Sequence, residues 1–235
     1  MNIPEKLIEL RRIMDRENIA AYIISGTDPH NSEYLPAPWQ QRKWISGFTG
    51  SYGTVVVTKN EAGLWTDTRY FIQAEKELAG SGIKLHKLRV PDAVDYPQWL
   101  VEVLESGTKV GIDGFCMSVS DVRNLKNALS PKNITIQKQI DLLGEMWFDR
   151  PALPVEKIIR LDTKYVGESA GERIGKIREF IRNNHGDAML FSCLDEIAWL
   201  YNIRCNDIAY NPVAISYAIV EKDKAHLFIK LDKIS

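Results

Sequence analysis

The chain has 235 residues, of which 45% are hydrophobic and 26% charged, a composition typical of a globular protein with one large or two modest domains. Its 30 basic and 31 acidic side chains give a net charge of −1, so no overall field attracts nucleic acid or anionic lipid. No window approaches the roughly 20 apolar residues of a membrane span, and the N-terminus lacks the features of a signal peptide. We therefore expect a soluble, cytoplasmic protein with no nucleic-acid and no membrane partner.

Cysteine usage argues against both a disulfide framework and a zinc site. The three cysteines, Cys116, Cys193 and Cys205, are odd in number and lack Cys-x-x-Cys spacing. We expect all three to be buried thiols, because free cysteine packs as a small hydrophobic residue.

Helical and strand periodicities alternate over the first 150 residues. Residues 3–18 carry apolar side chains at helical spacing among charged ones, which predicts an amphipathic helix. A β-branched run at residues 54–58, followed by the turn residues 59–63, predicts the first half of a hairpin. Alternating strands and helices indicate an α/β domain. Further strands are expected at residues 20–25, 64–67, 83–88 and 109–113, and further helices at 68–79 (capped by Thr66 or Asp67), from Pro97, and at 118–129.

A domain boundary is expected near Arg150, because two prolines at positions 151 and 154 interrupt both periodicities. We therefore divide the chain into domains at residues 1–150 and 151–235. In the second domain we expect strands at residues 157–161, 187–192 and 224–230, and a long helix at 168–183.

The two domains are related by an internal repeat. Residues 20–25 align with residues 187–192, and each segment follows an amphipathic helix and precedes an aspartate, Asp28 or Asp195. The second copy also has fewer residues after this strand, so we expect a fragment that stops inside its second domain.

The first copy of the repeat contains a polar insertion. Asp28 and Trp44 are 16 positions apart, but Asp195 and Trp199 only 4, so the first copy has 12 additional residues. These include His30, Asn31, Ser32 and Glu33. The insertion is either a functional loop or a variable surface loop.

Most motifs of enzyme chemistry are absent from the sequence. The glycines of residues 47–53 precede a β-branched strand and lack a Lys-Ser/Thr pair, so we interpret them as turn positions and not as a phosphate loop. His30 and Glu33 have a spacing that could ligate a metal, but no further ligands accompany them. No Gly-x-Ser-x-Gly elbow and no Cys–His pair is recognisable.

Arg69 is the main candidate for ligand binding. It follows a predicted strand end, at the sheet edge where α/β folds place ligand contacts. Its guanidinium could bind a carboxylate or a peptide carbonyl with two parallel hydrogen bonds. The alternative is an internal ion pair with Asp67 or Glu33.

Seven motifs together make the chain resemble the Xaa-Pro aminopeptidases (aminopeptidase P) of the three-domain form. The resemblance covers nearly all 235 residues, in the expected order. It implies an α/β fold of two tandem, related creatinase N-terminal-type domains, each a ribonuclease H-like mixed sheet flanked by helices, with the second truncated. The motifs are Ser25–Leu35, Trp44–Ser51, Leu64–Phe71, Trp147–Pro151, Leu194–Arg204, Asn211–Pro212 and Ser216–Ala218.

The resemblance implies that the parent protein hydrolyses the N-terminal Xaa-Pro bond of peptides with proline at the second position. Such enzymes use two divalent metal ions, usually manganese, in a C-terminal pita-bread catalytic domain that this chain lacks. The resemblance therefore implies no catalytic residue, no metal ligand and no bound cofactor here, and a fragment that is inactive alone.

What the chain retains, by this resemblance, is a part that caps the active-site cleft, contacts its own C-terminal catalytic domain and supports a homodimer. Arg69 and Glu33 match family positions that face or support the cleft, and His30 and Asp28 belong to the same motif. Thr68 replaces the usual glycine of the family. A stand-alone creatinase-like module that binds peptides or proteins without catalysis is the alternative.

Overall fold

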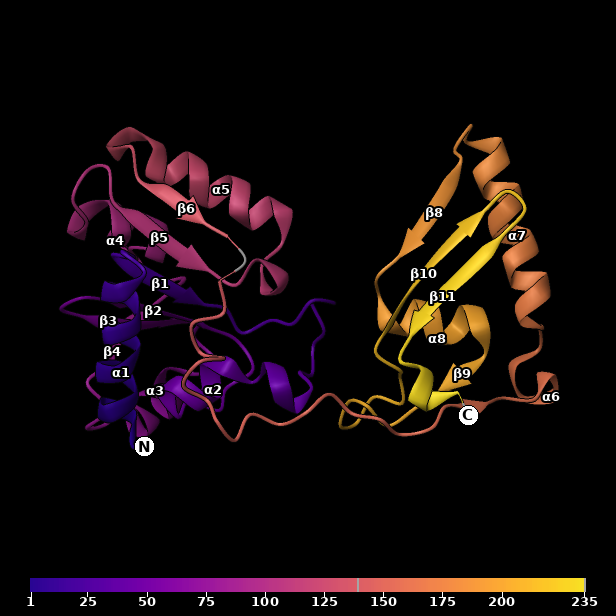
Figure 1. Ribbon diagram of the computed structural model, residues 1–235, viewed down its shortest axis with the longest axis horizontal. Coiled ribbons are helices and arrows are strands. Elements are labelled where there is room, and N and C mark those ends of the chain that lie inside the picture. Colours follow the sequence, from indigo (N-terminus) through magenta and orange to yellow (C-terminus); the bar gives the residue numbers. More distant parts are fainter. Residues whose placement is uncertain (139, 235) are drawn as a thin grey trace. The chain divides into compact units, whose positions relative to one another are not determined.

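The computed structural model describes residues 1–138 and 140–234, which form two compact units (Figure 1). Unit 1 comprises Met1–Asn31 and Pro38–Pro151. Unit 2 comprises Ser32–Ala37 and the described chain from Ala152 onward. Part of the polar insertion thus belongs to the second unit, although it lies within the sequence of the first.

Unit 1 is built on a six-stranded mixed sheet of order β4-β3-β2-β1-β5-β6. The hairpin β2–β3 and the pair β1–β2 are antiparallel, whereas β1–β5, β3–β4 and β5–β6 are parallel. The predicted hairpin is thereby confirmed. The strands are β1 Ala21–Ile24, β2 Thr54–Thr58, β3 Ala62–Thr66, β4 Lys84–Lys87, β5 Lys109–Ile112 and β6 Thr135–Gln137.

Helices cover both faces of this sheet (Figure 1). Strand side chains alternate between faces, so Tyr22 and Ile24 pack on the side of α1, whereas Ile23 packs on the side of α4 and α5. Each face therefore has its own apolar core. The helices are α1 Ile3–Arg16, α2 Gln41–Ser46, α3 Phe71–Glu77, α4 Tyr96–Val103 and α5 Val119–Leu129, with 3₁₀ turns η1 Ala37–Trp39, η2 Gly114–Cys116 and η3 Ser130–Lys132.

Side-chain caps fix where several of these helices begin. Asn2 and Glu5 form a reciprocal capping box at α1, and Asp95 and Ser118 cap α4 and α5. The expected cap of the helix at 68–79 is wrong. That helix, α3, begins after Tyr70 without a side-chain cap, because the Asp67 carboxylate accepts the backbone N–H of Arg69 in the preceding turn.

Unit 2 has an antiparallel three-stranded sheet of order β11-β10-β8 and a two-stranded pair of β7 and β9. Helices α7 and α8 contribute to its apolar core, in which Ile181, Ile197 and Phe191 are buried. The elements are α6 Thr163–Val166, α7 Ala170–Asn183, α8 Leu194–Tyr201, β7 Ile159–Arg160, β8 Ala188–Phe191, β9 Ile203–Arg204, β10 Ser216–Glu221, β11 Ala225–Ile229 and η4 Leu231–Lys233.

The cysteine prediction is correct for two of the three residues. Cys116 and Cys205 are buried and Cys193 is exposed, and all three are free thiols. Cys193 lies in the short connection between β8 and α8, where no element covers it in the described part of the chain. Within that part, no helix is both long and apolar enough to cross a membrane.

Candidate functional site

Arg69 lies in a turn at the carboxyl end of β3, held by a buried carboxylate. Its backbone N–H, Nε and Nη2 donate to the oxygens of Asp67 over 3.1, 3.0 and 2.9 Å. The Asp67 side chain is only 1% exposed, whereas that of Arg69 is 58% exposed. The internal ion pair with Asp67 is therefore present, yet it leaves one side of the guanidinium open to solvent.

The pKa values of this pair shift in opposite directions. Hydrogen bonding to Arg69 holds the pKa of Asp67 below its ordinary value, against a smaller opposing effect of burial. The same hydrogen bonds raise the pKa of Arg69. Both groups are thus charged at neutral pH, and the turn presents a fixed cation.

Aromatic rings and a second arginine flank the Arg69 side chain. Its Cζ lies 5.7 Å from the ring centroid of Tyr52 and 5.2 Å from that of Tyr70. The Cζ of Arg89 lies 5.8 Å from the Tyr52 ring, and its Nη1 is 3.8 Å from Asp67 Oδ2. Two guanidinium groups therefore share one carboxylate and one aromatic ring.

A buried arginine holds the glycine loop that carries Tyr52. Arg42 donates to the carbonyl oxygens of Gly50, Ser51 and Gly53, and its burial lowers its pKa to about 10. At Gly26, a Cβ would collide with the Arg42 guanidinium. In the loop itself, a Cβ at Gly50 would collide with the Phe48 ring, so this glycine allows the close approach expected at a turn.

A hollow of about 350 Å³ lies beside Tyr52, at the carboxyl end of β1. Its lining includes Ser25, Thr27, Tyr96 and Cys116. The hydroxyls of Ser25 and Thr27 donate to the carbonyl oxygen of Cys116, which leaves a wall of mixed polar and apolar character. The arginine pair, Tyr52 and this hollow make up the candidate site.

The other residues singled out from the sequence occupy the loop after β1. Asp28 and His30 are buried, at 3% and 7% exposure, and Asp28 Oδ1 accepts the backbone N–H of His30 over 3.0 Å. Glu33 is exposed and belongs to unit 2, whereas Asp28, His30 and Arg69 belong to unit 1. The structure therefore brings Asp28 and His30 together in one turn, and it places Arg69 in a different turn.

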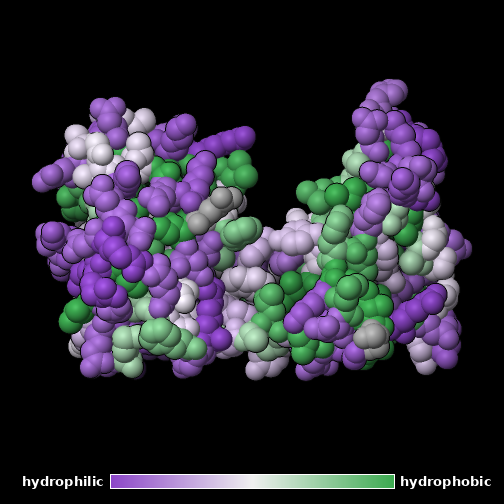
Figure 2. Space-filling view, viewed as in Figure 1, coloured by the Kyte–Doolittle hydropathy of each residue, from purple (hydrophilic) through white to green (hydrophobic). Residues whose placement is uncertain are grey.

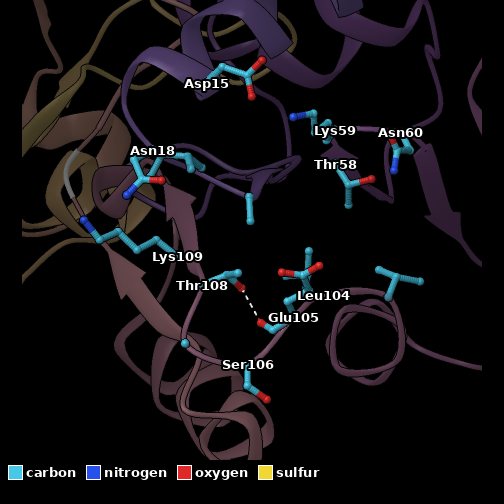
Figure 3. Close-up of a pocket in the computed structure, with 14 residues that line it drawn as sticks. Asp15, Asn18, Thr58, Lys59, Asn60, Leu104, Glu105, Ser106, Thr108 and Lys109 are labelled. Atoms are coloured by element: carbon cyan, nitrogen blue, oxygen red, sulfur yellow. Dashed lines mark hydrogen bonds between the residues drawn. The ribbon is translucent and has the colours of Figure 1, made fainter.

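A second hollow, of about 490 Å³, lies at the opposite, amino end of β1 (Figure 3). Asp15 and Glu105 contribute acidic groups to its lining, and Lys59 and Lys109 contribute basic ones. All four side chains belong to exposed residues, and the charges balance. It lacks the buried anchoring group that distinguishes the Arg69 site, so we do not assign a function to it.

Comparison with known proteins identifies the family. A model described as "Creatinase/Prolidase N-terminal domain" matches residues 6–143, and a second model with the same description matches residues 149–235. The chain belongs to the creatinase/prolidase N-terminal domain family. The predicted α/β fold of two such domains is thereby confirmed, with the mixed sheet flanked by helices in unit 1.

Relatives of this creatinase/prolidase chain are Xaa-Pro aminopeptidases. It is 39% identical over 238 residues to Aminopeptidase P2 of Arabidopsis thaliana, covering 99% of this chain and 33% of the relative. Xaa-Pro aminopeptidase 1 of Dictyostelium discoideum is 39% identical over 242 residues, with coverage of 99% and 38%. The chain thus spans well under half the length of these relatives and matches their N-terminal, non-catalytic part.

A solved structure extends the comparison to three dimensions. The X-prolyl aminopeptidase of Caenorhabditis elegans, described as a cytosolic enzyme with a di-nuclear active site, matches with a TM-score of 0.94 at 36% identity. The match covers 100% of this chain and 40% of that one. The two creatinase-type units of the chain therefore have close counterparts in that enzyme.

The described residues of the chain do not fit a di-nuclear metal centre. Within residues 1–138 and 140–234, no three His, Cys, Asp or Glu side chains are grouped so that they could hold a metal ion. Asp28 accepts the backbone N–H of His30. We therefore derive no chemical step through a metal held by these residues.

Sequence reasoning missed two residues of the site, Arg42 and Arg89. Arg42 is buried, and it donates to the carbonyl oxygens of the glycine loop that follows it. Arg89, whose backbone is left-handed with φ 60°, lies with Nη1 3.8 Å from Asp67 Oδ2. Neither contact has a spacing or a periodicity that the sequence alone reveals.

Proposed function

We propose that this chain belongs to a proline-specific aminopeptidase, which hydrolyses the bond between an N-terminal residue and a following proline. The observation that carries the proposal is the match to Xaa-Pro aminopeptidases along nearly the entire chain, at 39% identity to the Arabidopsis relative. The TM-score of 0.94 to the Caenorhabditis elegans enzyme supports the same assignment. Its partners are peptides with proline at the second position, and its location is the cytoplasm.

The chemistry belongs, in this proposal, to a catalytic domain outside this chain. Two divalent metal ions, manganese in our proposal, would supply an activated hydroxide there. The support is that the Caenorhabditis elegans enzyme, of which this chain covers 40%, is described as having a di-nuclear active site. This chain would contact that catalytic domain and contribute to a homodimer.

The role we propose for the chain is to cap the cleft and to contact the substrate. Arg69 is the strongest candidate, because its guanidinium is fixed by buried Asp67 and still 58% exposed. His30 and Asp28 would support the loop after β1, since both are buried in one turn. Glu33 is exposed and could meet substrate directly.

Peptidase kinetics on the complete gene product test this proposal. We expect cleavage of Xaa-Pro peptides with added manganese, and kcat/KM about tenfold lower for Arg69→Ala because a charge-assisted hydrogen bond is lost. Arg12→Ala is the matched control, since Arg12 is similarly exposed, at 63%, and similarly paired, with Glu9. It should leave kcat/KM unchanged.

Two outcomes contradict the proposal in different ways. Equal kinetics for Arg69→Ala and the parent protein would remove Arg69 from the substrate contacts. A complete gene product that binds peptides but never cleaves them would favour the stand-alone binding module. Urea unfolding of Arg69→Ala should accompany the kinetics, so that a folding defect is not mistaken for a lost contact.

A further inference from the structure

The pairing of Arg69 and Arg89 around Asp67 leaves an unbalanced positive charge at the surface. Both guanidiniums approach the Asp67 carboxylate, with nitrogen–oxygen distances of 2.9 Å from Arg69 and 3.8 Å from Arg89. The Asp67 side chain is 1% exposed, whereas those of Arg69 and Arg89 are 58% and 70% exposed. Two positive charges and one buried negative charge therefore present a net cation to solvent.

Both arginines also retain unused hydrogen-bond donors. Arg69 uses Nε and Nη2 on Asp67, and no hydrogen bond from its Nη1 is found in the described part of the chain. The Arg89 side chain donates no hydrogen bond within residues 1–138 and 140–234. A guanidinium with free donors in a fixed plane is suited to bind a carboxylate with two parallel hydrogen bonds.

Arg69 is fixed by Asp67 before any ligand arrives, and Arg89 lies beside the same carboxylate. Both lie beside the Tyr52 ring, at 5.7 and 5.8 Å from its centroid, and Tyr52 is carried by the loop that buried Arg42 holds. Preorganised donors lose little conformational entropy on binding.

We propose that Arg69, Arg89 and Tyr52 form a carboxylate-binding site. This inference rests on the proposed function for the identity of the ligand, which is the carboxylate of a peptide. The carboxylate would lie on the arginines, and the adjoining residue would enter the hollow of about 350 Å³ that Tyr52 helps to line. Asp121 also lines that hollow, and its carboxylate, which accepts from Ser118 Oγ over 2.6 Å at the start of α5, would repel an acid there. The site would therefore accept the acid only at its arginine end.

A peptide offers this carboxylate from its C-terminus or from an acidic side chain, and a titration distinguishes the two sources. The 235-residue chain is titrated with Ala-Pro-Gly-Gly as the free acid, with its C-terminal amide, and with the amide Ala-Pro-Gly-Glu-NH₂. The arginine Nε–Hε signals are followed by NMR. We expect the Arg69 and Arg89 signals to shift with the free acid but not with the plain amide. A shift with Ala-Pro-Gly-Glu-NH₂ would assign the site to acidic side chains.

Variants separate a built site from general charge attraction. Arg89→Gly suits the left-handed backbone, keeps Asp67 paired with Arg69, and should weaken binding of the acid about tenfold. Arg12→Ala removes an exposed arginine of another acidic pair and should not change binding. Equal affinity for the free acid and the plain amide, or unchanged binding in Arg89→Gly, would overturn the inference.

The titration needs no peptidase activity, so it can fail independently of the proposed function. Carboxylate binding without Xaa-Pro cleavage by the complete gene product would leave this site standing and remove the aminopeptidase assignment. Cleavage without carboxylate binding would leave the aminopeptidase assignment standing and remove this site.

Discussion

The two units contain the same three-stranded core sheet but cover it differently. In unit 1 the strands β3, β2 and β1 share an apolar core with helices α1 and α2. In unit 2 the strands β11, β10 and β8 share one with helices α7 and α8. Ile23 and Leu190 occupy equivalent positions, each opposite a β-branched residue of the next strand. Ile23 is 2% exposed, whereas Leu190 is 66% exposed.

The same contrast appears two strands away. Trp65 in β3 and Phe228 in β11 occupy equivalent positions, because each pairs with the corresponding residue of the middle strand, β2 or β10. Trp65 is 1% exposed and Phe228 is 53% exposed. In unit 1, α4 and α5 pack on this face, together with Trp99 and Leu125. In the described part of unit 2 this face is open, and Figure 2 shows hydrophobic residues gathered over β8, β10 and β11. Burial thus depends on the helices that cover a face and not on the strand sequence itself.

The units also differ in how each accommodates a buried cation. Arg42 in unit 1 is surrounded by carbonyl oxygens, whereas Lys233 in unit 2 is 2% exposed and pairs over 2.5 Å with Asp207, which is 0% exposed. Asp207 also accepts the backbone N–H of Ile215 over 2.7 Å. Loss of either Lys233 or Asp207 would leave the other charge buried without a partner, so this pair is the more sensitive of the two arrangements to substitution.

The largest effect should follow from Lys233→Met. The substitution leaves the Asp207 charge buried without its cation, so we expect unit 2 to lose about 3–5 kcal/mol of stability. Hydrogen exchange of the β10 amides measures the loss, and exchange of the β1 amides in unit 1 serves as the internal reference. The double variant Lys233→Met/Asp207→Asn should recover more than half of it, because no charge then remains. A double variant as unstable as the single one would show that packing, and not charge, is what Lys233 provides.

The next effect concerns the matched pair Ile23 and Leu190. Ile23→Ala opens a cavity between β1 and the helices α4 and α5, and should destabilise unit 1 by about 2–5 kcal/mol. Leu190→Ala changes an exposed residue and should alter unit 2 by no more than about 0.5 kcal/mol. Urea unfolding followed by exchange of β1 and β8 amides measures both.

A large loss of stability in Leu190→Ala would contradict the contrast between Ile23 and Leu190, because it would mean that the open sheet face of unit 2 is covered in solution. A second copy of the chain is one such cover, since an open apolar face and the free edge of β8 favour association. Light scattering over a range of concentrations would then show a dimer that Leu190→Lys abolishes.

The comparison also explains what the sequence could and could not reveal. The hairpin, the helix 118–129 and the repeat were predictable, because periodicity and caps such as Ser118 are local signals. The opposite burial of Ile23 and Leu190 was not, since both stand in continuous apolar runs, at residues 21–24 and 188–191. The exposure of Cys193 is another instance of the same limit.

The candidate site was predictable only in part, for the same physical reason. Arg69 was recognisable as the residue after a strand end, and its ion pair with Asp67 was one of the expected alternatives. Arg89 lies near that pair, in a turn beyond β4 where its backbone is left-handed. An arginine at position 89 does not indicate such a conformation in the sequence. The split of the polar insertion, with Glu33 in unit 2, depends on tertiary packing and not on local pattern.

The smallest effect concerns two aspartates whose pKa values are both lowered by a cation. Hydrogen bonding to Arg69 lowers the pKa of buried Asp67, and hydrogen bonding to Lys222 lowers that of Asp187, which is 96% exposed. A lowered folded-state pKa gives stability that is present above the ordinary value of about 4 and is lost as the pH falls through the folded value. We expect Asp67→Asn to be less stable than the parent chain at pH 7 and to converge with it in acid, whereas Asp187→Asn should match the parent throughout, because solvent screens an exposed pair. Urea midpoints of each unit between pH 7 and pH 2.5 measure this. A parallel offset of Asp67→Asn at every pH would instead mean that the residue acts through the shape of its turn and not through its charge.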